Sequence, residues 1–199
     1  NNYQAELLDA AAQACKAGVA RSHIVSYSVD GALLTELFTR TGGGTLVSQE
    51  PFEQLREASI EDVGGLIELI SPLEEQGILV RRSREVLERE VEQFSIVERE
   101  GLIIACAALY PIADSESGEL ACLAVNPEYR HGRRGDELLE RIEARARALG
   151  LKTLFVLTTR TAHWFRERGF KEIGPEALPR QKRELYNLQR RSKVFVKNL

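Results

Sequence analysis

The residues best suited to chemistry lie in a loop between Val125 and Leu138, which reads Val-Asn-Pro-Glu-Tyr-Arg-His-Gly-Arg-Arg-Gly-Asp-Glu-Leu. The loop follows an apolar run and enters a helical pattern, so it meets a helix N-terminus, where N–H groups are unpaired and the helix dipole is positive. Gly132 and Gly135 would let the backbone approach a ligand closely, and three arginines add positive charge. These residues predict a diphosphate cradle, with an ordinary capped surface loop as the alternative.

A second basic region lies at the carboxyl end of the chain. Residues 180–197 contain seven Lys or Arg against one Glu, although the whole chain has a formal net charge of −3. That net charge argues against general nucleic-acid binding. A local basic cluster on an acidic protein suits a small anionic ligand, and a solvated surface is the competing explanation.

The composition is that of a globular protein. The 199 residues are 43% hydrophobic and 29% charged, and no apolar run reaches the roughly 20 residues that span a bilayer. An odd number of cysteines without a disulfide framework favours a reducing cytosol, so we expect a cytoplasmic protein without a membrane segment. Neither the cysteines nor the histidines have metal-ligand spacing, and we expect no metal site; they are Cys15, Cys106, Cys122, His23, His131 and His163.

The hydrophobic pattern divides the chain near residue 50. The first part predicts helix, strand, helix, strand at residues 6–17, 23–27, 32–38 and 45–47, and residues 48–51 are typical of a linker. In the second part Ser59 is a predicted helix N-cap with Asp62 three residues on, ahead of apolar residues at helical spacing. Further helices are predicted at 83–92, 136–149 and 162–168, and strands at 94–97, 102–110, 120–125, 153–158, 170–173 and 194–196. This order predicts an α/β fold of the mixed α+β kind, a mixed sheet flanked by helices.

Residues 120–139 resemble the acetyl-CoA motif of the GNAT superfamily of N-acetyltransferases. In that motif a strand leads into Arg/Gln-x-x-Gly-x-Gly/Ala at a helix start, and here the hexapeptide is Arg130-His131-Gly132-Arg133-Arg134-Gly135. Its fourth position, Arg133, is not the usual glycine. The resemblance implies that the amides from Arg130 to Gly135 hold the pyrophosphate of acetyl-CoA. It also implies that backbone groups of Leu123 and Val125 contact the pantetheine and the acetyl carbonyl.

Five further segments extend the resemblance to one family within that superfamily, the bacterial N-acetylglutamate synthases. The family's reaction transfers an acetyl group from acetyl-CoA to the α-amine of L-glutamate, giving N-acetylglutamate and CoA, the first step of arginine biosynthesis, with no metal. The resemblance covers the chain from about Glu50 onward. The segments are 122–125, 154–160, 163–165, 167–170 and 191–194.

The resemblance assigns roles to individual residues. A free α-amine is largely protonated at pH 7, so attack on the thioester needs a proton acceptor, and Glu119 at the start of the central strand is the candidate base. Thr158 and Tyr186 are candidates to stabilise the departing thiolate. Arginine holds a carboxylate with two parallel hydrogen bonds. Arg190 and Ser192 stand where the family binds glutamate, and Arg160 is a further candidate.

The amino-terminal part resembles a different kind of protein. Residues 1–50 resemble the carboxyl-terminal end of an amino-acid-kinase domain, so the implied domains are a kinase-like remnant at 1–50 and an N-acetyltransferase at 51–199. Glu36 and Gly42 match positions that contact arginine in arginine-sensitive kinases, and arginine is a feedback inhibitor of full-length synthases. We expect this remnant alone to have neither kinase activity nor a competent arginine site.

Two other functions stay open from the sequence. One is an acetyltransferase of the same superfamily with another small amine acceptor, although the basic carboxyl end disfavours cationic acceptors. The other is a non-catalytic module that binds acyl-CoA or senses arginine. The expected partners are small molecules, with no nucleic acid and no membrane. Homo-oligomer formation stays open because the family assembles largely through its kinase-like domain.

Overall fold

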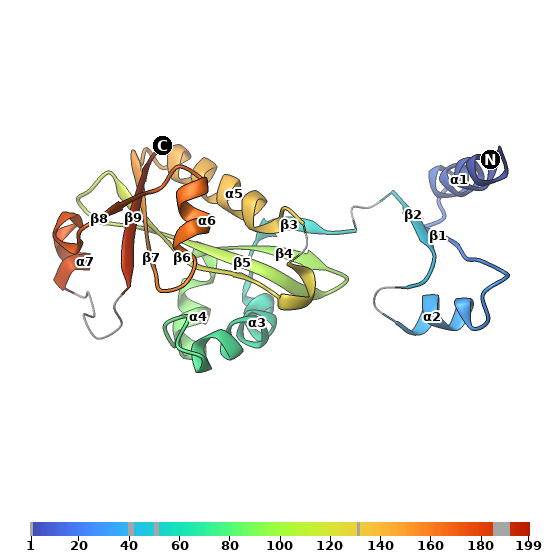
Figure 1. Cartoon of the computed structure of the whole chain (residues 1–199), viewed down its shortest axis with the longest axis horizontal. Helices are drawn as coiled ribbons and strands as arrows, with labels where there is room; N and C mark the ends of the chain where they lie inside the picture. Colours follow the sequence, from blue (N-terminus) through green and yellow to red (C-terminus); the bar gives the residue numbers. More distant parts are fainter. Residues whose placement is uncertain (1, 40–41, 50–51, 131, 185–191) are drawn as a thin grey trace. The chain divides into compact units, whose positions relative to one another are not determined.

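The computed structural model describes residues 2–39, 42–49, 52–130, 132–184 and 192–199 (Figure 1). The chain divides into two compact units, an amino-terminal unit at Asn1–Phe52 and a carboxyl-terminal unit at Glu53–Leu199. Within the described ranges, no helix is long and apolar enough to cross a membrane. That the first unit comes from a kinase-like domain stays a prediction.

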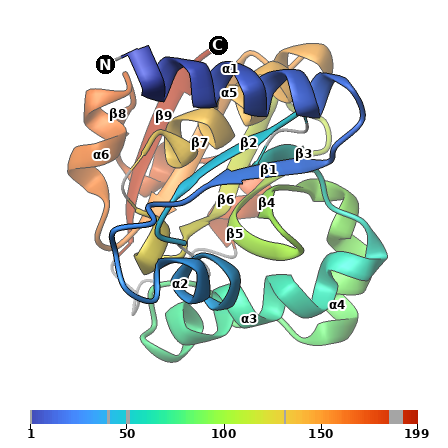
Figure 2. The same cartoon turned by 90° about the vertical axis from the view of Figure 1, so that its right-hand side faces the viewer.

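The amino-terminal unit packs one helix on a two-stranded sheet. Strands β1 (Arg21–Ile24) and β2 (Thr45–Ser48) pair antiparallel, and helix α1 (Asn2–Lys16) lies along them (Figure 2). The Cys15 thiol of α1 donates to the carbonyl of Val47 at 3.2 Å, and the Gln49 side chain donates to the Cys15 carbonyl at 2.8 Å. The short helix α2 (Ala32–Phe38) connects the two strands.

The carboxyl-terminal unit is built on a seven-stranded mixed sheet. Its order is β3-β4-β5-β6-β7-β9-β8, and all neighbours are antiparallel except β6 and β7, which are parallel. This is the mixed sheet that the sequence predicts. The strands are β3 (Gln54–Glu57), β4 (Phe94–Arg99), β5 (Leu102–Pro111), β6 (Ser117–Val125), β7 (Thr153–Thr158), β8 (Lys171–Ile173) and β9 (Lys193–Asn198).

Helices cover both faces of this sheet (Figure 1). On one face α3 (Val63–Glu75) and α4 (Arg84–Glu90) bury an apolar cluster against β4, β5 and β6. On the other face α5 (Arg134–Ala148) and α6 (Ala162–Glu167) bury a second cluster against the sheet. The remaining elements are α7 (Arg180–Glu184) and the 3-10 turns η1 (Ile60–Asp62), η2 (Val91–Gln93), η3 (Pro127–Tyr129) and η4 (Pro175–Ala177).

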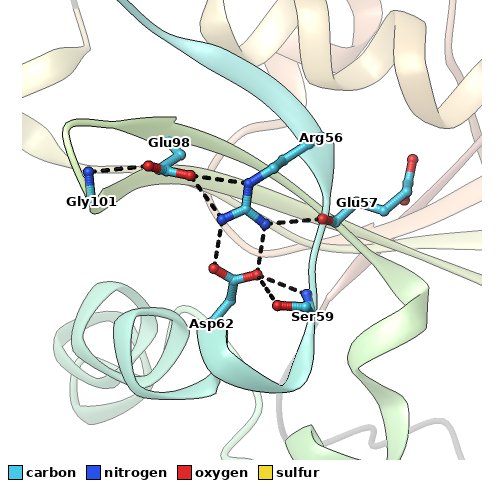
Figure 3. A network of polar contacts seen from close by, with 6 residues as sticks. All are labelled: Arg56, Glu57, Ser59, Asp62, Glu98 and Gly101. Carbon is cyan, nitrogen blue, oxygen red and sulfur yellow. Dashed lines mark hydrogen bonds and ion pairs between the residues drawn. The ribbon is translucent and has the colours of Figure 1, made fainter.

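Arg56 ties the first edge of the sheet to the start of α3 (Figure 3). Its guanidinium donates to Asp62 at 2.7 and 2.8 Å and to Glu98 of β4 at 2.8 and 3.0 Å. Asp62 also accepts from the backbone N–H of Ser59 at 2.7 Å, which completes the predicted capping box. The hydrogen bonds from Arg56 lower the pKa of Asp62 to about 2, since they favour the ionised carboxylate.

Candidate active site

The central feature of the site is a fork between β6 and β7. The parallel pairing ends at Glu119 opposite Phe155, yet β6 continues to Val125 and β7 to Thr158. Past that point the two strands separate, and residues of both line a cavity of about 1220 Å³. Strands that part within a sheet leave backbone groups available to a ligand, so this cavity is the candidate site.

A β-bulge shapes the β6 side of the fork. The register with β5 passes from Ala108 opposite Ala121 to Cys106 opposite Ala124, so β6 has one extra residue at Cys122 and Leu123. Cys122 has a φ of 53°, a left-handed conformation that costs energy for a residue other than glycine. The thiol of Cys106 donates to the Cys122 carbonyl at 3.3 Å and helps to hold this shape. The bulge lies at the cavity, which Cys122, Leu123 and Ala124 line.

The loop after β6 brings its backbone to the same cavity. Gly132 has a φ of 135°, which side-chain-bearing residues rarely adopt. At Gly135 the constraint is one of space, because a Cβ there would lie 3.2 Å from the Trp164 ring of α6. Both glycines line the cavity together with Arg130. The amides of this loop and of the α5 N-terminus are therefore presented at the mouth of the fork.

Two of the three loop arginines direct their side chains to carboxylates. The guanidinium of Arg134 donates to Glu53 at 2.8 Å and to the carbonyl of Tyr129 at 2.8 Å, so it holds the loop in shape. Arg133, with a side chain 73% exposed, contacts Glu140 on α5 and does not line the cavity. Their charges are thus partly neutralised, and what the loop offers an anion is chiefly its backbone. The predicted residue His131 lies outside the described residues.

Glu119 stands at the point where the strands part, and its carboxylate forms an ion pair with Lys182 of α7. The two side chains are 13% and 30% exposed. Tyr110 pairs with Glu119 on the neighbouring strand β5, and its hydroxyl donates to Glu90 at 3.0 Å. Burial, followed by the Glu90 carboxylate, raises the pKa of Tyr110, so it stays protonated.

Arg82 is a charged residue of this site that the sequence interpretation missed. It follows α3 in a loop that lines the cavity, and its guanidinium donates to the Val80 carbonyl at 3.0 Å. Burial lowers the pKa of Arg82, but Cys122, Tyr110 and Glu119 together outweigh burial and raise it, so the guanidinium stays charged. The available signal was an Arg81-Arg82 pair in an otherwise acidic stretch.

Thr158 lies at the end of β7 and caps the turn into α6. Its hydroxyl contacts that of Thr161 at 2.7 Å and accepts from the amides of Arg160 and Thr161 at 3.3 and 3.1 Å. Arg160 and the buried Ser192 line the cavity as well. The other two predicted residues of this group, Tyr186 and Arg190, lie outside the described residues.

The cavity is electropositive although the chain is acidic. Seven of its described lining residues are Lys or Arg and three are Asp or Glu, an excess of four positive charges. A cavity of one sign of charge concentrates ligands of the opposite sign. The charged residues are Arg81, Arg82, Arg130, Arg134, Arg160, Arg168 and Lys182, with Glu74, Glu119 and Asp136.

In the amino-terminal unit, Glu36 organises the glycine loop before β2. Its carboxylate accepts from the amides of Gly43 and Gly44 at 2.7 Å each and contacts His23 at 2.6 Å. The hydrogen bond with His23, followed by those from the two amides, lowers the pKa of Glu36. Gly42 has a φ of 63° and donates to the Thr39 hydroxyl at 3.2 Å. The two predicted arginine-contacting residues thus lie close together, Glu36 on α2 and Gly42 in the glycine loop.

A mixed sheet that opens between two parallel strands, with a loop and helix N-terminus at the opening, is the fold of the GNAT N-acetyltransferases. Residues 90–172 match the family model of the acetyltransferase (GNAT) domain, which confirms the predicted fold class. The chain is 84% identical over all its 199 residues to the amino-acid acetyltransferase of Pseudomonas paraeruginosa. The predicted resemblance to the amino-acid N-acetyltransferases of the GNAT superfamily is therefore confirmed.

Solved structures agree with the sequence comparison. N-acetylglutamate synthase from Neisseria gonorrhoeae, complexed with coenzyme A and L-arginine, matches 100% of this chain with a TM-score of 0.88 and 41% identity. The same enzyme with coenzyme A and N-acetyl-glutamate matches 97% with a TM-score of 0.72 and 44% identity. The chain spans 46% of the length of the Pseudomonas relative and 45 to 46% of the Neisseria chains.

Proposed function

We propose that this chain transfers the acetyl group of acetyl-CoA to the α-amine of L-glutamate, giving N-acetylglutamate and CoA. The observation that carries this proposal is the electropositive cavity at the fork between β6 and β7. CoA carries several phosphates and glutamate two carboxylates, so both ligands suit a cavity with an excess of cations. The 84% identity to an amino-acid acetyltransferase and the ligands of the Neisseria structures support the same reaction.

In this proposal acetyl-CoA binds along the fork. The amides from Arg130 to Gly135, at the N-terminus of α5, bind its pyrophosphate. Backbone groups of Leu123 and Val125 contact the pantetheine and the acetyl carbonyl. An N–H donor directed at the carbonyl oxygen stabilises the negative charge of the tetrahedral intermediate, and the bulge at Cys122 and Leu123 supports that role for the Leu123 amide.

The acceptor amine is proposed to lose its proton to Glu119, directly or through a water. Glu119 suits this task because it lies at the point where β6 and β7 separate and is mostly buried. The departing thiolate would be stabilised by Thr158 or Tyr186. For Thr158 the hydroxyl already has several partners, which favours Tyr186.

The two carboxylates of glutamate are proposed to bind to the basic side chains of the cavity. Arg160 and Ser192 line it, and Arg190 stands two residues before Ser192 in the chain. Arg82 joins them because a half-buried guanidinium facing a cavity favours an anionic partner. This set suits a dicarboxylate better than a cationic amine.

The amino-terminal unit is proposed to belong to an arginine-binding domain, with Glu36 and Gly42 among its contacts and arginine as inhibitor of the whole protein. The related Neisseria enzyme was crystallised with L-arginine, which supports this assignment. The Glu36 carboxylate already accepts from two glycine amides, so its proposed part is to hold the glycine loop in shape for the ligand. We further propose a cytoplasmic location, as the metabolite substrates require.

The test is CoA release, followed with a thiol reagent, with glutamate and with other amino acids. Glutamate-dependent release that falls at least 100-fold in Glu119→Gln is expected, since general-base catalysis contributes about 10²–10⁴-fold. Glu116→Gln is the matched control, because Glu116 is exposed and pairs with Lys152 outside the cavity. Acetyl-CoA binding without turnover on any amino acid would refute the reaction. An unchanged Glu119→Gln variant would remove Glu119 as the base.

A further inference from the structure

We propose that Lys182 determines acceptor specificity as an exchangeable counter-ion, which leaves Glu119 and binds the carboxylate next to the acceptor amine. The inference rests on the proposed acetyl transfer to an amino acid. Its starting observation is that the proposed base is not free. The Glu119 carboxylate forms an ion pair with the Lys182 ammonium, and both residues line the cavity.

The residues just before α7 anchor Lys182 beside Glu119. Leu178 is buried in a cluster with Ile112, Phe155 and Val194. Phe155 is the β7 residue that pairs with Glu119 at the fork. The anchor of α7 therefore packs on the strand position beside the base. The amide of Lys182 donates to the Pro179 carbonyl at 2.9 Å, which fixes the first turn of α7.

In the protein without bound substrate, the ion pair neutralises the mostly buried Glu119 carboxylate. Glu119 is largely removed from water, and a buried carboxylate without a cation is unfavourable. Lys182 supplies that cation at the position which the acceptor's ammonium group must reach before it can lose a proton. A lysine side chain suits an exchange of partners because its ammonium sits on a flexible four-carbon stem and can move while α7 stays anchored.

Binding of an amine at Glu119 changes the balance of charges. Glu119 would then have the Lys182 and incoming ammonium groups beside it, with the Arg82 guanidinium in the same cavity. An α-amino acid relieves this excess, because its carboxylate is attached to the same carbon as its amine and arrives beside Lys182. An amine without that carboxylate displaces Lys182 and offers it no anion in return. Lys182 thereby favours amino acids over simple amines.

The experiment compares three variants of the whole chain. Lys182→Met keeps the length of the side chain and removes its charge, and Lys182→Arg keeps the charge. Lys152→Met is the matched control, since it breaks a lysine–glutamate pair of 2.6 Å outside the cavity. Each is assayed for kcat, for the KM of acetyl-CoA and for the KM of L-glutamate and of γ-aminobutyrate, which has the amine and distal carboxylate but lacks the α-carboxylate.

Lys182→Met is expected to raise the KM of glutamate about 10-fold or more, as fits the loss of one charge-assisted hydrogen bond. The KM of acetyl-CoA should stay within twofold. The preference for glutamate over γ-aminobutyrate should fall about 10-fold, and Lys182→Arg should restore most of it. The Lys152→Met control should match the wild type.

Other outcomes would overturn the inference. An unchanged glutamate KM and unchanged preference in Lys182→Met would exclude Lys182 from acceptor binding. Equal losses toward glutamate, γ-aminobutyrate and acetyl-CoA, without rescue by Lys182→Arg, would identify the ion pair as a structural tie. Wild-type protein inactive toward every amino acid would refute the proposed reaction, and the role of Lys182 with it. Wild-type turnover of glutamate beside an unaltered Lys182→Met would refute the role of Lys182 alone.

Discussion

Asp62→Asn is expected to lower the unfolding free energy of the carboxyl-terminal unit by about 2 kcal/mol at pH 7. Asparagine keeps the shape of the side chain and removes the charge that Arg56 contacts at 2.7 and 2.8 Å (Figure 3). The pKa of Asp62 falls from 3.8 to about 2, chiefly through those hydrogen bonds. At roughly 1.4 kcal/mol per pKa unit, this shift corresponds to about 2 kcal/mol. The Asp62 side chain is only 10% exposed, so solvent screening is slight.

The pH dependence has a definite sign. The folded-state pKa of Asp62 lies below its unfolded value, so the stabilisation is fully present above the unfolded pKa near 4 and disappears as pH falls through about 2. The difference in stability between wild type and Asp62→Asn should therefore be constant above pH 5. It should narrow steadily between pH 5 and pH 2.

Urea unfolding followed by tryptophan fluorescence measures this difference, because Trp164 is the single tryptophan of the chain and reports only on the carboxyl-terminal unit. Glu88→Gln is the control. It breaks the Arg84–Glu88 pair, whose side chains are 62% and 41% exposed, and should cost less than about 0.5 kcal/mol. A cost below about 0.5 kcal/mol for Asp62→Asn, or a difference that does not change with pH, would refute the reasoning.

Three further predictions concern the fork. Gly135→Ala places a Cβ 3.2 Å from the Trp164 ring and should shift the tryptophan emission and weaken CoA binding several-fold; unchanged fluorescence would count against that contact. Thr158→Val should lower stability by about 1 kcal/mol, as for a lost hydrogen bond, because the Thr158 hydroxyl accepts from two amides of the turn, whereas Thr158→Ser should behave like wild type in urea unfolding. Arg133→Gln should leave CoA affinity within twofold by calorimetry, since its guanidinium contacts Glu140 outside the cavity, and a tenfold loss would contradict that geometry.

The sequence predicts most α-helices and strands that the structure describes but misses one short strand and one short helix. Helix Ala32–Phe38 and strand Thr153–Thr158 have the bounds that their apolar spacing indicates. The missed strand β3, Gln54–Glu57, is a polar edge strand held by side-chain ion pairs, and it has no alternating apolar pattern. The missed helix α7, Arg180–Glu184, contains no apolar residue, because its neighbour Leu178 provides the buried anchor.

The sequence likewise predicts some features of the candidate site and misses others. The loop proposed to bind phosphate is recognisable because its glycines and arginines lie within six residues, 130–135. The partners of those arginines are not recognisable, since Arg134 contacts a residue 81 positions earlier, Glu53. Arg82 and Lys182 belong to no local motif, and they join Glu119 only because α3, α7 and β6 converge on one cavity. Ion pairs between residues distant in the sequence therefore determine which basic side chains are available to bind a ligand.

The fork explains why one strand can serve both substrates. Pairing with β7 ends at Glu119, so the proposed base lies where the two strands part, and its mostly buried carboxylate needs a cation. Three residues later comes the bulge at Cys122, and the next residue, Leu123, lines the cavity where the thioester is proposed to bind. The strand then ends in the loop proposed to bind the pyrophosphate. The proposed base, oxyanion donor and phosphate cradle thus follow one another along β6 and the loop after it, and their spacing is set by backbone geometry. The basic residues proposed for the acceptor come from other elements, so changes in acceptor specificity should map to residues such as Arg82, Arg160 and Lys182 and leave acetyl-CoA binding unchanged.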